Sequence, residues 1–126
     1  VVGAGDPTDR PGQVAGAAAF GITMAVIEFL FAPFQGIMHG GLVESMPDLV
    51  AYLIVGEMAG AVLLFVASVV VLRRRGWAFY VVAACWHLAM CVPYVVVGAV
   101  SGLVLAPLPL VGLVLITPSR VRRWYG

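Results

Sequence analysis

Apolar runs long enough to cross a lipid bilayer alternate with short polar breaks along this chain. A helix needs about 20 mostly apolar residues to cross the hydrocarbon core of a bilayer. The polar breaks are the segment QGIMHGGLVESMPD, the segment RRRG and a short stretch near GAVSG. The pattern predicts an all-α polytopic membrane protein, in which residues 1–126 form a single transmembrane domain. We expect a four-helix bundle with spans at about 13–34, 49–72, 77–98 and 100–117.

The fourth expected span contains the segment APLPL, with Pro107 and Pro109 near its middle. Each proline removes a backbone donor, so the pattern predicts a kinked fourth helix. In some transporters a broken helix marks a binding site, but a membrane proline more often only kinks a packed helix. The break near GAVSG is short, which leaves three spans as an alternative.

The composition excludes an ordinary soluble domain. The chain has 126 residues, of which 63% are hydrophobic and 10% are charged. Soluble domains contain about 45–50% apolar and about 25% charged residues. No basic patch with interleaved aromatic residues is present, so we expect no nucleic-acid partner. The chain also lacks a Ser/His/Asp set, a nucleotide-binding glycine loop, CxxC and HExxH. We therefore expect no enzyme activity, no metal and no cofactor.

The basic residues predict the orientation in the membrane. All seven are arginines: Arg10 precedes the first span, Arg73–Arg75 follow the second, and Arg120, Arg122 and Arg123 follow the fourth. Four spans place all of them on one side, whereas three spans would leave one cluster outside. The positive-inside rule then predicts a multi-pass protein of a bacterial plasma membrane with both termini in the cytoplasm.

Three ionisable residues lie inside the expected spans: Glu28, Glu57 and His87. An ionised acid at the bilayer centre costs about 2.5–3.5 kcal/mol on insertion scales, so these groups should face protein. A rise of 1.5 Å per residue places Glu57 and His87 in one layer and Glu28 one to two turns higher. Each lies on a seam of small or polar residues, and we expect the three to converge. The cluster is then either a buried hydrogen-bonded network that fixes the order of the helices, or a site that binds or transfers protons or cations.

The loop after the first span offers further candidates. It holds four polar residues that could contact a partner at the outer face, although a solvated connector is the more ordinary interpretation: Gln35, His39, Glu44 and Asp48. His39 and His87 lie at different depths, so we do not expect them to hold a haem. Cys85 and Cys91 are six residues apart in one span, which predicts two small core residues and no disulfide.

In outline, four spans, a short chain and a glutamate in the first span are similar to the small multidrug resistance exporters. This resemblance implies a homodimer in which Glu28 exchanges protons for a cationic compound. Glu57, His87 and the proline-containing fourth span depart from that family. The ending LVLITPSRVRRWYG resembles the tails of many small uncharacterised actinobacterial membrane proteins, over about a tenth of the chain. That second resemblance implies a compartment and a lineage.

Two functions follow as expectations. The first is a non-catalytic accessory or structural subunit that packs against a larger membrane complex, such as a respiratory or transport assembly. Its partners would be membrane lipids and other membrane subunits, or a second copy of the chain, because small-residue seams suit close helix packing. The alternative is a small proton-coupled exporter of cationic compounds that acts as a homodimer, with Glu28 and Glu57 as its proton-sensitive pair.

Overall fold

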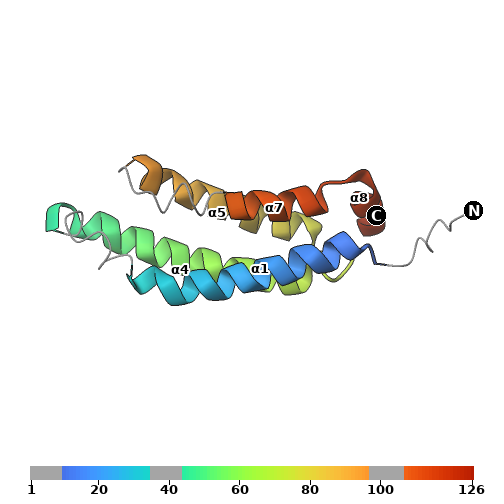
Figure 1. Cartoon of the computed structure of the whole chain (residues 1–126), viewed down its shortest axis with the longest axis horizontal. Helices are drawn as coiled ribbons and strands as arrows, with labels where there is room; N and C mark the ends of the chain where they lie inside the picture. Colours follow the sequence, from blue (N-terminus) through green and yellow to red (C-terminus); the bar gives the residue numbers. More distant parts are fainter. Residues whose placement is uncertain (1–9, 35–43, 97–106) are drawn as a thin grey trace, which may run out of the picture.

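A computed structural model of the chain describes residues 10–34, 44–96 and 107–126. This part of the chain contains helices and no strands, as the hydrophobic pattern predicts. The start of α1 and the C-terminal helix α8 lie at the same end of a long bundle (Figure 1). The elements are α1 (Gly12–Phe31), the short 3-10 helix η1 (Ala32–Phe34), α4 (Pro47–Val70), α5 (Trp77–Val96), α7 (Pro107–Ile116) and α8 (Ser119–Tyr125).

Two stretches of helix are long and apolar enough to cross a membrane. They are Gly12–Phe34 and Pro47–Val70, and a shorter apolar helix covers Trp77–Pro93. Only 33% of the most apolar window of each long stretch is buried inside the bundle. Most of their apolar surface therefore faces outward, whereas the core helix of a soluble protein buries most of its own. The all-helical class and the two long apolar helices agree with the expectation, and the count of four spans stays a prediction.

The helix boundaries follow the expected spans, with one exception. Pro47 lies in the first turn of α4, a favourable place because the first backbone N–H groups of a helix have no partner inside it. In the same way α7 begins at Pro107, so Pro107 and Pro109 both lie in its first turn. The kink expected at Pro107 and Pro109 stays a prediction, because residues 100–106 of the expected fourth span lie outside the described residues. Pro93 lies deeper within its helix, near the C-terminal end of α5.

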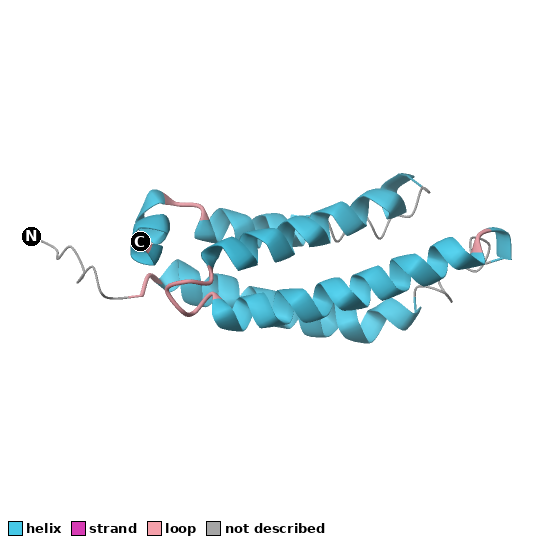
Figure 2. Cartoon of the chain, turned by 180° about the vertical axis from the view of Figure 1, so that it is seen from behind, coloured by secondary structure: helices cyan, strands magenta, loops and turns pink. Residues whose placement is uncertain are grey.

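The long helices pack in two layers, α1 with α4 and α5 with α7 (Figures 1 and 2). Contacts between the layers join α4 to α5 and α1 to α7. Small side chains line these contacts, which lets the helix backbones approach closely. The buried core combines alanines with a few larger residues: Ala17, Ala18, Ala67, Ala83, Ala84, Val14, Val71, Tyr80, Ile116 and Val121.

Tyr80 is the largest fully buried side chain of the core. Its hydroxyl donates a hydrogen bond to the backbone oxygen of Ala17 over 3.1 Å. A Cβ atom at Gly112 of α7 would collide with the Tyr80 hydroxyl, and a Cβ atom at Gly21 of α1 would collide with the Ser68 hydroxyl and lie 3.3 Å from the Tyr80 ring. The two glycines therefore make room for the ring at the point where α1, α5 and α7 meet.

The end of the bundle that carries the arginines is closed by α8. This short helix lies across the bundle end (Figures 1 and 2), and its Val121 is fully buried. The hydroxyl of Tyr125 donates a hydrogen bond of 2.5 Å to the backbone oxygen of Val71. Burial raises the pKa of Tyr125 to about 12, so the hydroxyl keeps its proton and acts as a donor. Val71 follows the last residue of α4, where backbone carbonyls lack helical partners.

We predict that Tyr80→Phe destabilises the bundle by about 1 kcal/mol, the net value of a typical hydrogen bond. The change removes the hydroxyl that reaches Ala17 and leaves the ring in place. Equilibrium unfolding in mixed micelles with increasing dodecyl sulfate would measure the difference. Tyr52→Phe is the matched control, since Tyr52 is 76% exposed and its loss of a hydroxyl should leave stability unchanged. Equal effects of the two substitutions would contradict this account.

Candidate functional site

Glu28 of α1 and His87 of α5 meet inside the bundle. The Oε2 atom of Glu28 contacts the Nε2 atom of His87. Both side chains are buried, with exposed fractions of 8% for Glu28 and 5% for His87. An acid and a base in direct contact, shielded from water, can share one proton between them. The contact links the first and third long helices of the chain.

Each partner reaches this place along a buried stripe of its own helix. On α1 the stripe runs through Gly21 and Ala25 to Glu28, at helical spacings of four and three residues. On α5 it runs from Tyr80 through Ala84 to His87, and Cys91 continues it. The stripe residues on α1 are small, so α5 can come near enough for the acid and the imidazole to touch. The sequence analysis had placed Glu28 and His87 each on a seam of small or polar residues.

A very small cavity adjoins the Glu28–His87 contact. Its volume is about 10 Å³, which is about the space that one water molecule requires. The second ring nitrogen of His87, Nδ1, is buried and has no hydrogen-bond partner among the described residues. No substrate larger than water fits in this space. The cavity is lined by residues of α1, α4, α5 and α7: Phe20, Gly21, Met24, Glu28, Leu64, Tyr80, Ala84, His87 and Pro109.

Glu57 of α4 lies close to this pair. It is partly exposed and interacts electrostatically with Glu28 and with Cys91. The three ionisable residues thus belong to one region of the bundle, with Glu28 and His87 in direct contact and Glu57 beside them. No group of three or more His, Cys, Asp or Glu side chains in the described part of the chain could hold a metal ion. The chemistry available here is the holding or exchange of a proton, and whether the protein uses it stays a prediction.

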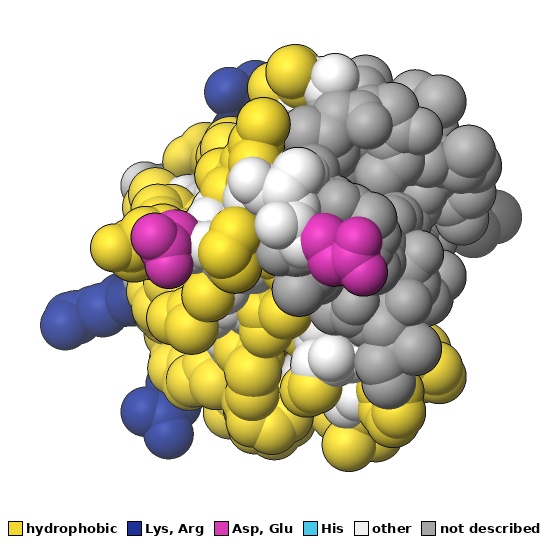
Figure 3. All heavy atoms as spheres, turned by 90° about the vertical axis from the view of Figure 1, so that its left-hand side faces the viewer, with side chains coloured by type: hydrophobic (Ala, Val, Ile, Leu, Met, Phe, Trp, Pro, Cys, Tyr) yellow, Lys and Arg dark blue, Asp and Glu magenta, His cyan; other side chains and the backbone are white. Residues whose placement is uncertain are grey.

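The candidate contact loop is described only in part. Gln35 and His39 lie outside the described residues. Glu44 and Asp48 are exposed, and Asp48 lies in the first turn of α4, where a negative charge favours the helix. The end of the bundle opposite the arginine end carries acidic side chains among hydrophobic ones (Figure 3). Its role in contacting a partner stays a prediction.

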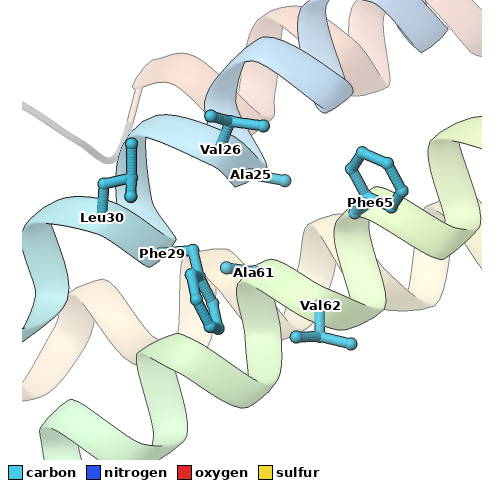
Figure 4. Close-up of a pocket in the computed structure, with 7 residues that line it drawn as sticks. All are labelled: Ala25, Val26, Phe29, Leu30, Ala61, Val62 and Phe65. Atoms are coloured by element: carbon cyan, nitrogen blue, oxygen red, sulfur yellow. The ribbon is translucent and has the colours of Figure 1, made fainter.

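Two features escaped the sequence analysis. One is an open apolar groove between α1 and α4, with a volume of about 280 Å³ (Figure 4). Ala25 and Ala61 are buried at its base, and Phe29 and Phe65 stand at its sides. The other concerns the cysteines, because Cys91 is buried but Cys85 is exposed, which makes the expectation of two core cysteines wrong for Cys85. The groove lies between apolar faces, which give no periodicity to reveal it. Cys85 is exposed because it lies off the stripe of α5 that holds Tyr80, Ala84, His87 and Cys91.

Comparisons of the chain with models of known protein families, with curated proteins and with solved structures find no match. What the fold itself defines is a helical protein with two helices long and apolar enough to cross a membrane. The function is therefore argued from the geometry of the site and of the surface.

We predict that the stability effects of removing Glu28 and His87 are strongly non-additive. Glu28→Leu or His87→Leu alone leaves a buried polar partner unsatisfied, which costs about 1–3 kcal/mol. The double variant replaces the pair by apolar side chains, so it should lose less than the sum of the single losses. The free energy of unfolding of all four proteins, measured in dodecyl sulfate titrations, gives the coupling energy.

The matched control combines His87→Leu with Thr23→Leu. Thr23 is exposed, and its hydroxyl donates to the backbone oxygen of Ala19 in the same helix. These two substitutions should add within about 0.5 kcal/mol, as independent sites do. Additive effects for Glu28 and His87 as well would show that the two side chains do not stabilise one another.

Proposed function

We propose that this protein is a non-catalytic accessory subunit that packs, as a four-span bundle, against a larger complex in a bacterial plasma membrane. One observation carries the proposal: the contact between Glu28 and His87 is enclosed within one chain, whereas the outward surface is apolar and carries a groove. Such a protein presents no open polar site to a soluble substrate in its described part. Its apolar outer surface is suited to contacts with neighbouring helices and lipids.

The exposed apolar side chains support insertion in a membrane. On α4 alone, Tyr52 and Val55 are 76% and 65% exposed, and several further apolar residues follow along the helix. The same is true of α1, where Leu30 and Phe31 are 60% and 61% exposed. Soluble monomers rarely expose contiguous apolar patches larger than a few hundred Å². Lipid tails or partner helices would cover this surface.

The groove between α1 and α4 supports a partner helix in particular. Its lining consists entirely of apolar residues, and α5 and α7 lie behind the two helices in the close-up (Figure 4). Association of helices in lipid depends on close van der Waals packing, and small residues such as Ala25 and Ala61 permit it. The occupant that fits is a transmembrane helix with apolar side chains, seated between Phe29 and Phe65.

A homodimeric proton-coupled exporter is the second candidate. The closeness of Glu28, Glu57 and His87 favours it, since intramembrane ionisable residues are by default candidates for proton handling. An exported cation would have to reach Glu28, which is 8% exposed beside a cavity of about 10 Å³. In the described part of the chain the larger hollow is apolar and lies outside the bundle. The accessory subunit is therefore the better supported proposal.

We predict that the arginine end faces the cytoplasm. A cysteine at Arg75, in the turn after α4, should be protected from an impermeant thiol reagent in intact cells. A cysteine at Glu44, near the start of α4, should be labelled. Both positions are exposed, so accessibility depends on the side of the membrane. Both variants need Cys85 and Cys91 replaced by alanine, and labelling at position 75 but not at position 44 would reverse the orientation.

We predict that removing the phenylalanine side chains at the sides of the groove releases the protein from its assembly. In gently solubilised native membranes the chain should migrate with a large complex of fixed stoichiometry. Phe29→Ala with Phe65→Ala should shift it to a smaller species, because the partner helix loses both side contacts. Phe31→Ala is the control, since Phe31 is more exposed than either but does not line the groove.

Two outcomes would contradict the accessory subunit. One is a dimer of about twice 13.3 kDa in the native membrane whose binding of a cationic compound varies with pH. The other is an assembly that survives the double phenylalanine variant while Phe31→Ala disrupts it. Glu28→Gln would then separate the two roles, because it should abolish proton-coupled export and leave a packing role intact.

A further inference from the structure

The arginines of the described chain lie at one end of the bundle and come from separate segments. Arg10 precedes α1, Arg73–Arg75 form the turn after α4, and Arg120, Arg122 and Arg123 belong to α8. All seven are exposed. The exposed acids of the described chain, Glu44 and Asp48, lie at the start of α4, some 24 residues of helix away. Among the described residues, no acidic side chain lies at the arginine end.

The short helix α8 has two chemically different sides. Val121 is fully buried, and Trp124 and Tyr125, three and four residues further on, are partly buried beside it. The three arginines and Ser119 occupy the remaining positions and are exposed. A helix of this pattern that lies across the end of a membrane bundle is suited to the plane of the lipid headgroups.

Contacts hold α8 against the turn after α4, so the arginines of both segments form one surface. The guanidinium of Arg74 lies 5.8 Å from the centre of the Trp124 ring, within the range of a cation–π interaction. The Trp124 ring meets the Tyr125 ring edge-on at 4.9 Å, and Tyr125 is bonded to Val71. We call the surface formed by Arg73–Arg75, Arg120, Arg122 and Arg123 the arginine surface.

We propose that the arginine surface binds the phosphate headgroups of anionic phospholipids. The guanidinium groups offer paired N–H donors that match phosphate oxygens, and the charge of the surface is unbalanced by the described residues. Trp77 and Trp124 add aromatic rings at the level where lipid headgroups meet the hydrocarbon. A headgroup is favoured over a soluble anion because its acyl chains can lie along the exposed apolar side chains of α4 outside the groove, such as Val66 and Val69.

This inference rests on the proposed membrane insertion and adds a lipid class to it. The two can fail separately. Resistance of the protein to extraction from membranes by alkaline carbonate tests insertion alone and says nothing about headgroups. The lipid measurement uses the same membrane preparation after purification in a neutral detergent, so a result on headgroups is interpreted only for protein that has passed the first test.

The experiment counts bound lipid by native mass spectrometry of the full chain. Phosphatidylglycerol and phosphatidylcholine with identical acyl chains are titrated in parallel. The expected result is retention of phosphatidylglycerol at lower concentration, with a preference that weakens as salt is added. Each basic residue near an anionic surface contributes roughly a fivefold change in affinity, so Arg120→Gln, Arg122→Gln and Arg123→Gln together should reduce the affinity on the order of a hundredfold.

Two matched variants separate charge from folding. Replacing the same three arginines by lysine keeps the charge and should retain most of the preference. Glu44→Gln with Asp48→Asn alters charge at the opposite end and should leave the preference unchanged. Equal retention of both lipids, no loss in the glutamine variant, or full displacement by inorganic phosphate at the same phosphate concentration would overturn the proposal. Displacement by an acidic peptide at equal charge would point to a protein partner instead and would also overturn it.

Discussion

Polar-tipped aromatic side chains of α5 reach a backbone carbonyl on each of the three helices around it. Trp77 donates to Ile116 of α7, Tyr80 to Ala17 of α1, and Trp86 to Gly56 of α4. In lipid the hydrophobic effect adds little to helix association, so van der Waals packing and such directed bonds fix which helices meet and at what height. The glycines beside them are a condition for these bonds, since a Cβ at Gly60 would come within 2.8 Å of the Trp86 ring.

The Glu28–His87 contact follows from this arrangement of α5. Tyr80 sets the height of α5 against α1, and His87 lies two helical turns further along the same face. Glu28 lies three turns beyond Ala17 on α1, and its side chain contacts His87. The contact between the acid and the imidazole in turn joins α1 to a helix from the other layer.

The helix faces that carry Glu28 and His87 could be predicted from the sequence, because polar and small residues interrupt otherwise apolar helices there. Glu28, His87 and Tyr80 stand out on their helices, so their buried faces could be assigned by spacing alone. The groove between Phe29 and Phe65 could not be found this way, since all residues around it are apolar and hydropathy does not distinguish lipid-facing from partner-facing positions. Helix α8 was not predicted, because seven residues with three arginines resemble a polar tail. Its packing depends on the burial of Val121 and on the bond from Tyr125 to Val71 at the end of α4.

The bond between Tyr125 and Val71 imposes an order on synthesis. The two residues are 54 positions apart. At a synthesis rate of about 5–20 residues per second, Tyr125 is therefore made roughly 3–10 s after Val71, and until then the Val71 carbonyl lacks this donor. Deep in a bilayer an unpaired carbonyl would be costly for that long. At the arginine end it can bond to water in the meantime. In the membrane protein proposed above, α8 can therefore close the end of the bundle after the other described helices are in place, and the Val71 carbonyl need not be unpaired in hydrocarbon.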